Sequence, residues 1–256
     1  MTDFDFIVVG GGSSGCVTAA KLVSGHDARV LLLEMGPRNN HPLLRMPAGF
    51  IKMLSGSKYL TFHKTVPQPQ LGGRVHDVPQ GRVLGGGSTV NAMVYMRGRP
   101  SDYAGWEEAT GGRGNGFGWG WEDILPHYVR QEANQSLAGP AHGVSGPLKV
   151  SNPRHVAEIS DIFVKALQRM GQPLRSDFNA GEQAGVGYMQ TTTGDGRRCG
   201  AVEAFLAPAA ANPRLTVRTD VTVMRIIFEG RKAVGVEYSE SGQIRIARAA
   251  QEIIVT

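Results

Sequence analysis

"DFDFIVVGGGSSGCVTAAKLVSGHDARVLLLEMGP", residues 3–37, decides the fold. The apolar run Phe6–Val9 is typical of a buried strand, and a helical pattern follows the glycine-rich turn at 10–15. A second apolar run, Val30–Leu33, ends at Glu34. The order strand, glycine turn, helix, strand begins a Rossmann-like unit, which binds the ADP half of a dinucleotide. The stretch therefore predicts an α/β fold with a nucleotide site at its first turn.

Each glycine of this turn has its own predicted role. Gly10 permits the turn, Gly12 brings the backbone close to a pyrophosphate, and Gly15 lets the helix pack on the strand. The free N–H groups and positive dipole at the helix start attract phosphate. Glu34 follows Gly15 by 19 residues, where a carboxylate binds a ribose hydroxyl and disfavours NADP. An ordinary glycine turn is the alternative. NAD and FAD both remain open here, although the glycine two residues after Glu34 favours FAD.

The composition is that of a globular protein. The chain has 256 residues, 41% of them apolar, and its 35 glycines cluster in a few loops. No apolar run approaches the roughly 20 residues of a membrane span, so we expect no membrane partner and a cytoplasmic location. The net charge of +5 is scattered, which predicts no nucleic-acid partner. The two cysteines, Cys16 and Cys199, are expected to be free thiols, and no residue spacing indicates a metal site.

A second glycine cluster lies in "GRVLGGGSTVNAMVYMRG", residues 81–98. It is no phosphate-binding P-loop, because no lysine occurs between Lys64 and Lys149. Three adjacent glycines let backbone lie against a flat or charged group, and Ser88, Thr89 and Asn91 add hydrogen-bonding groups beside it. A flavin with its pyrophosphate would suit such a surface.

This second stretch resembles the first signature of the glucose-methanol-choline (GMC) family of flavin oxidoreductases. Further blocks are similar to family blocks in the same order: "RPSDYAGWEEATG" (99–111), "GWEDILPHYVRQE" (120–132), "AHGVSGPLKVS" (141–151) and "GRRCGAVEAFLAPAAANPRLTV" (196–217). The resemblance implies a Rossmann-like FAD-binding domain with a β-meander, plus the beginning of an α+β substrate-binding domain.

The resemblance also implies domain bounds. Residues 1–150 would be the first part of the FAD-binding domain, 151–198 the start of the substrate-binding domain, and 199–256 the continuation of the FAD-binding domain. In the family, the strand-like end "QEIIVT" (251–256) leads into a glycine loop and the C-terminal half. We therefore expect a fragment, or one of two pieces, whose partner is the missing C-terminal half.

The cofactor site is carried over from the family residue by residue. Five residues of the first turn would hold the pyrophosphate, Glu34 the adenosine ribose, and residues 82–88 the diphosphate and flavin. Residues 91–94 would lie near the reactive edge of the flavin, and Val223 matches a position whose backbone contacts adenine. Val90 stands where choline oxidase and similar members carry a covalently linked histidine, so FAD is expected to be non-covalent. The implied set is Gly10, Gly12, Ser13, Ser14, Gly15, Glu34, Arg82, Leu84, Gly85, Gly86, Ser88, Asn91, Ala92, Met93, Val94 and Val223.

The family mostly oxidises alcohols: a histidine base takes the hydroxyl proton while hydride passes to flavin N5. The resemblance implies a FAD-dependent enzyme acting on the CH–OH group of a small-molecule alcohol, with O₂ or another electron acceptor. None of the seven histidines matches the family's catalytic positions, so we expect no catalytic residue in this chain. A lyase or decarboxylase of the same fold, and a non-catalytic FAD-binding fragment or subunit, remain alternatives. Arg197 and Arg198 are interpreted as pinning the junction of two domains, with binding of an anionic substrate as the alternative.

Further elements follow from local patterns. Apolar spacing predicts a helix from Val156 that closes at Gly171, and another helix begins near Asp123. Residues 64–74 lack periodicity and are expected to form an extended surface connector. Apolar residues alternate from Leu215 to Val223, which predicts one half-buried strand, and turns at 229–232 and 239–242 predict a meander after it.

Overall fold

The computed structural model describes residues 3–112 and 118–256. The chain forms two compact units, one of Met1–Ala92 with Arg198–Thr256 and one of Met93–Arg197. The prediction of functional domains at 1–150, 151–198 and 199–256 stays a prediction, since compactness alone assigns no function.

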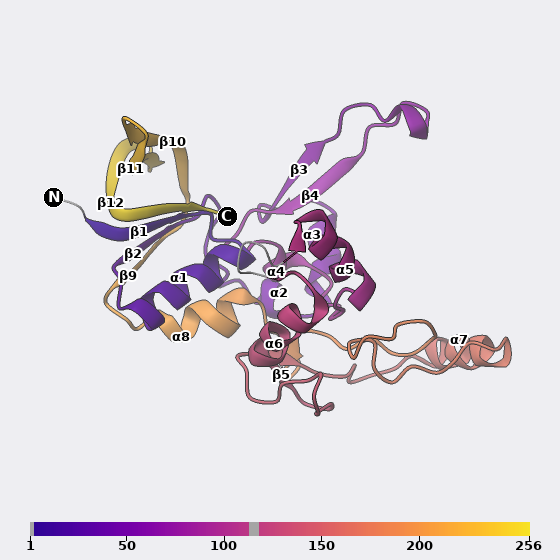
Figure 1. Ribbon diagram of the computed structural model, residues 1–256. Coiled ribbons are helices and arrows are strands. Elements are labelled where there is room, and N and C mark those ends of the chain that lie inside the picture. Colours follow the sequence, from indigo (N-terminus) through magenta and orange to yellow (C-terminus); the bar gives the residue numbers. More distant parts are fainter. Residues whose placement is uncertain (1–2, 113–117) are drawn as a thin grey trace. The chain divides into compact units, whose positions relative to one another are not determined.

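A six-stranded sheet forms the centre of the first unit, in the order β10-β11-β12-β1-β2-β9 (Figure 1). β12, β1, β2 and β9 run parallel to one another, whereas β10, β11 and β12 form an antiparallel meander. The strands are β1 (Phe4–Val9), β2 (Val30–Leu33), β9 (Leu215–Arg218), β10 (Val221–Glu229), β11 (Lys232–Glu240) and β12 (Gln243–Val255). The predicted Rossmann-like sheet with a meander is therefore confirmed.

Alternation along β1 and β2 divides the core into two halves. Val8 and Leu32 point to the face covered by α1 (Ser13–His26) and belong to one buried cluster. Ile7 and Leu33 point to the opposite face and belong to a second cluster with residues of the meander. Because successive side chains of a strand alternate between faces, a wholly apolar strand is what a sheet covered on both sides requires. Figure 1 shows α1 and α8 (Ala207–Ala209) on one face and the meander on the other.

The predicted single strand from Leu215 to Val223 is wrong. The structure has two strands, β9 and β10, separated at Thr219 and Asp220. Asp220 has a φ of +59°, in the left-handed region that aspartate tolerates better than most residues. The turn sends β9 into the parallel part of the sheet and β10 into the meander, while the apolar alternation continues on either side.

The expected surface connector at 64–74 is the end of a β-hairpin. β3 (Leu60–Lys64) pairs antiparallel with β4 (Asp77–Gly81), and a short 3₁₀ turn, Pro69–Leu71, lies near the tip. The sequence between the strands is polar and rich in proline and glycine, and there the pairing is reduced to an isolated bridge between Gln68 and Arg74. Smaller helices of the same unit are α2 (Pro42–Arg45), α3 (Gly49–Leu54) and α4 (Gly87–Val90), and a π-helical turn, Val202–Leu206, precedes α8.

Among its described residues, the second unit has helices and short strand pairs. α6 begins at Trp121, two residues before the predicted start, and α7 ends at Arg169 before Gly171, as its apolar pattern predicted. The elements are α5 (Pro100–Ala109), α6 (Trp121–Gln131), β5 (Glu132–Asn134), β6 (Leu148–Val150), α7 (Glu158–Arg169), β7 (Thr193–Gly194) and β8 (Arg197–Arg198).

A buried polar cluster holds the second unit together. Arg97 and Glu132 form an ion pair of 2.8 Å, with side chains 1% and 0% exposed. Glu132 also accepts from Asn134 Nδ2 (2.8 Å) and Gly143 N (3.0 Å), and it lies 3.1 Å from His142 Nδ1. A buried charge needs such partners, because removing it from water is otherwise unfavourable. The cluster joins segments that are far apart in sequence.

Candidate functional site

The first glycine turn carries β1 into α1. Gly10 has a φ of +103°, and a Cβ on Gly15 would lie 1.9 Å from the Gly10 carbonyl oxygen. These two glycines are therefore required by the backbone itself. Gly12 differs, because a Cβ there would meet no atom within 4 Å. Gly12 is also the N-cap of α1 and provides no side chain to cap it, so the first N–H groups of the helix lack a side-chain acceptor.

Glu34 follows β2 directly and is only 8% exposed. Its two carboxylate oxygens accept from Gly11 N (2.8 Å) and Gly36 N (2.7 Å). Burial raises the pKa of Glu34 above its ordinary value, while these two backbone hydrogen bonds and the charge of Arg82 oppose that shift. Glu34 therefore fixes the glycine turn, and each of its oxygens retains a lone pair for a further donor.

Replacing Glu34 with glutamine is expected to lower the free energy of unfolding by about 1–3 kcal/mol, because one amide oxygen replaces two acceptors. A raised carboxyl pKa means that the native state holds the proton more tightly, so the contribution of Glu34 falls as pH rises above 4.5. The loss should therefore be larger near pH ~5 than near pH ~7, as urea unfolding would measure. The exposed Glu252→Gln is the control. Equal stability of E34Q and wild type at both pH values would contradict the prediction.

The second glycine cluster lies directly against the first. Gly85 N donates to Gly11 O at 2.7 Å, and a Cβ on Gly86 would lie 2.8 Å from Gly12 Cα. Gly86 also has a φ of +49°. From the sequence, this cluster was explained by contact with a ligand alone, but contact between the two loops already excludes a side chain at Gly86. At Gly87, by contrast, an added Cβ would meet nothing within 4 Å.

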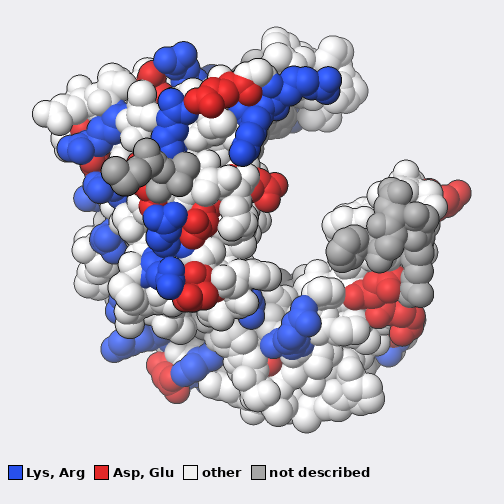
Figure 2. Space-filling view, turned by 60° about the vertical axis from the view of Figure 1, so that its left-hand side comes forward, with Lys and Arg blue, Asp and Glu red and all other residues white. Residues whose placement is uncertain are grey.

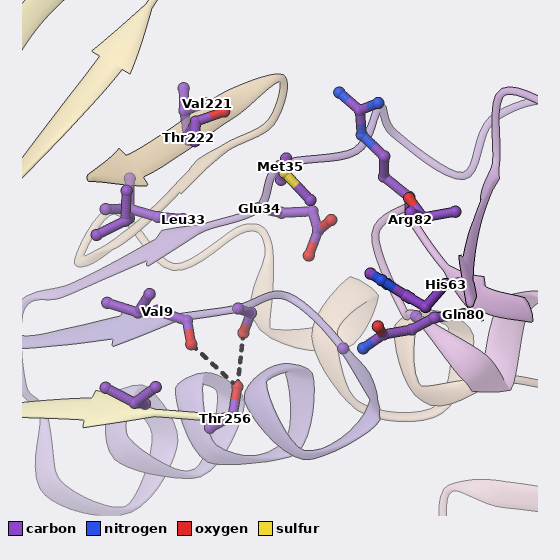
Figure 3. A pocket seen from close by; sticks show the side chains of 17 residues that line it. Val9, Leu33, Glu34, Met35, His63, Gln80, Arg82, Val221, Thr222 and Thr256 are labelled. Carbon is purple, nitrogen blue, oxygen red and sulfur yellow. Dashed lines mark hydrogen bonds between the residues drawn. The ribbon is translucent and has the colours of Figure 1, made fainter. Parts of the chain in front are cut away.

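A cavity of about 370 Å³ opens between the first glycine turn, the end of β2 and the β3–β4 hairpin (Figure 3). In Figure 3, Glu34 and Met35 extend from the end of β2, and His63 and Gln80 lie opposite on the hairpin. Six residues of the predicted set line the cavity: Gly10, Gly12, Glu34, Arg82, Gly86 and Val223. The structure thus brings together residues that are up to 213 positions apart in the sequence.

A second cavity of about 440 Å³ lies on the other side of the second glycine cluster. Asn91 and Ala92 of the predicted set line it, together with Gly87 and Val90. Gln80 and Gly81 line both cavities. The two cavities therefore adjoin the same end of β4.

Other members of the predicted set lie outside the lining of both cavities. Leu84 belongs to the buried core. Ser88 Oγ donates to Gly85 O (2.7 Å) and accepts from Ala201 N (2.9 Å), so it holds the loop in place. Ser13, Ser14 and Gly15 begin α1. Met93 and Val94 lie in the second unit, where Met93 has a φ of +63°.

Three hairpin residues that line the first cavity are not in the predicted set. Thr61, His63 and Gln80 come from β3 and β4, which pair Leu60 with Gly81 and His63 with Val78. Recognition of the hairpin would have placed its alternate residues on one face.

Charged side chains and possible metal ligands are the other features that could indicate a site. On the face drawn in Figure 2, lysine and arginine alternate with aspartate and glutamate. Within residues 3–112 and 118–256, no group of three or more His, Cys, Asp or Glu side chains could hold a metal ion. None of the helices in this described part is both long and apolar enough to cross a membrane.

Comparison with known proteins identifies the family. The sequence profile of the GMC oxidoreductase family matches residues 4–256. The chain is 37% identical to human mitochondrial choline dehydrogenase, over 99% of the chain and 43% of that protein. It is 40% identical to the alcohol dehydrogenase [acceptor] of Pseudomonas putida, over 92% of the chain and 42% of that protein.

A solved structure shows the same fold. An FAD-dependent oxidoreductase from Chaetomium thermophilum superimposes with a TM-score of 0.89 and 28% identity, over 99% of the chain and 45% of that protein. The chain thus spans less than half the length of the relatives it matches. The match of the family profile over nearly all its residues shows that this chain belongs to the GMC oxidoreductase family.

Proposed function

We propose that this chain binds FAD, without a covalent bond, as the cofactor-binding part of an oxidoreductase that acts on the CH–OH group of an alcohol. The observation that carries the proposal is that two cavities adjoin each other at Gln80 and Gly81, which line both. One cavity has Glu34 and the uncapped start of α1, and the other has Asn91 and Ala92. FAD has an ADP half at one end and a flat isoalloxazine ring at the other, which suits two adjoining cavities of this kind.

The residues of the first cavity suit the ADP half. The open space over Gly12 lets a pyrophosphate approach the first N–H groups of α1, which carry positive partial charge. The free lone pairs of Glu34 can accept from ribose hydroxyls, and Val223 on β10 lies at the adenine end. The exposed Arg82 adds a positive charge at the rim.

The second cavity suits the isoalloxazine. Gly87 has no side chain, so its backbone is accessible to a ligand, and Asn91 and Ala92 also line this cavity. Bound FAD supplies hydride acceptance at N5. Val90 lines this cavity and has no nucleophilic atom, which supports a non-covalent cofactor. No histidine of the described residues lines the second cavity, so the proton acceptor is proposed to lie outside the residues that line it.

Denaturation tests how the cofactor is held. The purified protein is expected to show flavin absorbance, and acid precipitation should leave all of the flavin in the supernatant, because Val90 offers no atom for a covalent bond. Flavin that stays with the precipitate would contradict the non-covalent proposal. A correctly folded protein that takes up no FAD at all would contradict the whole proposed function.

Anaerobic addition of alcohols tests the reaction. Bleaching of the flavin by choline or another primary alcohol supports CH–OH oxidation, and subsequent recovery of colour with O₂ or an artificial acceptor identifies the oxidant class. Retained colour with every alcohol points to a lyase or to a non-catalytic subunit instead.

The cytoplasmic location stays a prediction, and the name of the human relative assigns that protein to mitochondria.

A further inference from the structure

Arg198 is a buried cation that donates to uncharged oxygen atoms. Its side chain belongs to the first unit, and the residue is 4% exposed. Nε donates to Leu44 O (3.0 Å), and Nη1 donates to Ser88 O (3.2 Å). The guanidinium also donates to Asn91 Oδ1 (2.6 Å) and Asn91 O (2.7 Å). These donors of Arg198 are engaged within the protein, which disfavours binding of an anionic substrate by this side chain. The interpretation that Arg197 and Arg198 pin the junction of two domains stays a prediction.

The charge of Arg198 is only partly compensated. Buried charges are usually paired with an opposite charge, because desolvation is otherwise unfavourable. Among the described residues, Arg198 takes part in none of the ion pairs, and burial lowers its pKa to about 10. Glu203 acts on it electrostatically, but the Glu203 oxygens accept from Asn39 Nδ2 (2.7 Å) and Gly200 N (3.0 Å) instead.

The hydrogen bonds of Arg198 to the loop after the second glycine cluster do not by themselves explain why this side chain is charged. The acceptors of Arg198 are main-chain carbonyls and one amide oxygen, and neutral donors satisfy such groups in most proteins. Arg198 differs from such cases in the position of Asn91. Asn91 accepts two of the four hydrogen bonds from Arg198, and it also lines the second cavity. The positive charge therefore lies behind the wall of the space that we assign to the isoalloxazine.

We propose that Arg198 raises the reduction potential of the bound flavin by placing a partly compensated positive charge behind the Asn91 wall of the second cavity. This inference rests on the proposed function. A hydride brings two electrons and one proton to the ring, so the ring gains one negative charge, while the hydroxyl proton of the alcohol goes to a base. A fixed cation in a low-dielectric interior favours the more negative form of the cofactor.

Redox titration of the FAD-bound protein tests this role. We expect R198Q to shift the midpoint potential to a more negative value by about 30 mV, which is about tenfold in the two-electron equilibrium. R198K keeps the charge and should lie closer to wild type than R198Q does. E203Q removes the nearby negative charge and should shift the potential in the opposite direction, to a more positive value.

The opposite signs separate electrostatics from loop damage, because a damaged loop has no reason to raise the potential in one variant and lower it in another. If R198Q does not fold or loses FAD, E203Q decides: a more positive potential supports the proposal, and an unchanged or more negative one overturns it. If wild type and the three variants all bind FAD with the same midpoint potential, the role proposed for Arg198 is overturned, while the proposed function is not. Wild-type protein that holds no FAD overturns the proposed function, and the inference with it.

Discussion

Replacing Glu132 with alanine is expected to lower the free energy of unfolding by about 3–5 kcal/mol. The substitution leaves the Arg97 guanidinium, 1% exposed, without its carboxylate partner. It also removes the acceptor for Gly143 N and one of the two acceptors of Asn134 Nδ2, which keeps Gln190 Oε1. Cation–π contacts of Arg97 with Tyr95 and Tyr128 remain, but each is worth only about 0.5–2 kcal/mol and cannot replace the ion pair.

Urea denaturation of the purified protein measures this loss, with Asp77→Ala as the control. Asp77 forms an ion pair of 2.9 Å with Lys64, but both side chains are more than half exposed. An exposed pair is screened by water, so D77A should lose less than about 1 kcal/mol. Similar losses for the two variants would show that the buried cluster is not the main support of the second unit.

Replacing Gly15 with alanine is expected to destabilise the first unit by at least about 3 kcal/mol. The new Cβ would lie 1.9 Å from Gly10 O and 2.8 Å from Thr256 Oγ1. The first of these atoms is main chain, so it cannot rotate away, and the β1–α1 turn must shift. Alanine favours a helix over glycine by only about 1 kcal/mol, which the clash exceeds. Loss of cooperative thermal unfolding, or a large fall in Tm, would report the effect.

Gly12→Ala is the matched substitution in the same turn. Gly12 has a φ of −71°, and an added Cβ would meet nothing within 4 Å, so stability should stay within about 0.5 kcal/mol of wild type. The affinity for FAD should nevertheless fall at least about tenfold, because the methyl group enters the space proposed for the pyrophosphate. Titration by flavin fluorescence measures this affinity. Unchanged FAD affinity in G12A would place the pyrophosphate elsewhere.

Local patterns were enough to predict the start of the fold. β2 begins and ends at the residues predicted, Val30 and Leu33, because a wholly apolar run bounded by polar residues belongs to a sheet covered on both faces. The break at Asp220 was missed, since the apolar alternation continues across it and only the backbone conformation marks the turn. The pairing of β1 with β12 could not be predicted from either strand alone, because no local pattern specifies a partner so distant in sequence.

The candidate site could be predicted only where local spacing in the sequence determines it. Gly12 and Glu34 follow from a spacing that the chemistry of a dinucleotide imposes, and both line the first cavity. Thr61 and His63 reach that cavity only because β3 pairs with β4, which a polar, proline-rich sequence conceals. The contact of Gly86 with Gly12 is likewise a tertiary fact, and it explains a glycine that the motif assigned to the ligand.

The position of β12 in the sheet has a consequence for folding during synthesis. β1 pairs with β2 on one side and with β12 on the other, and the hydrogen bond from Thr256 Oγ1 to Gly10 O spans 246 residues. At about 5–20 residues per second, a ribosome needs roughly 10–50 s to make the chain between them. During that time one edge of β1 has no partner, and an open apolar edge invites pairing with other chains. β1 and the first glycine turn beside it are thus completed only after β12 has been made.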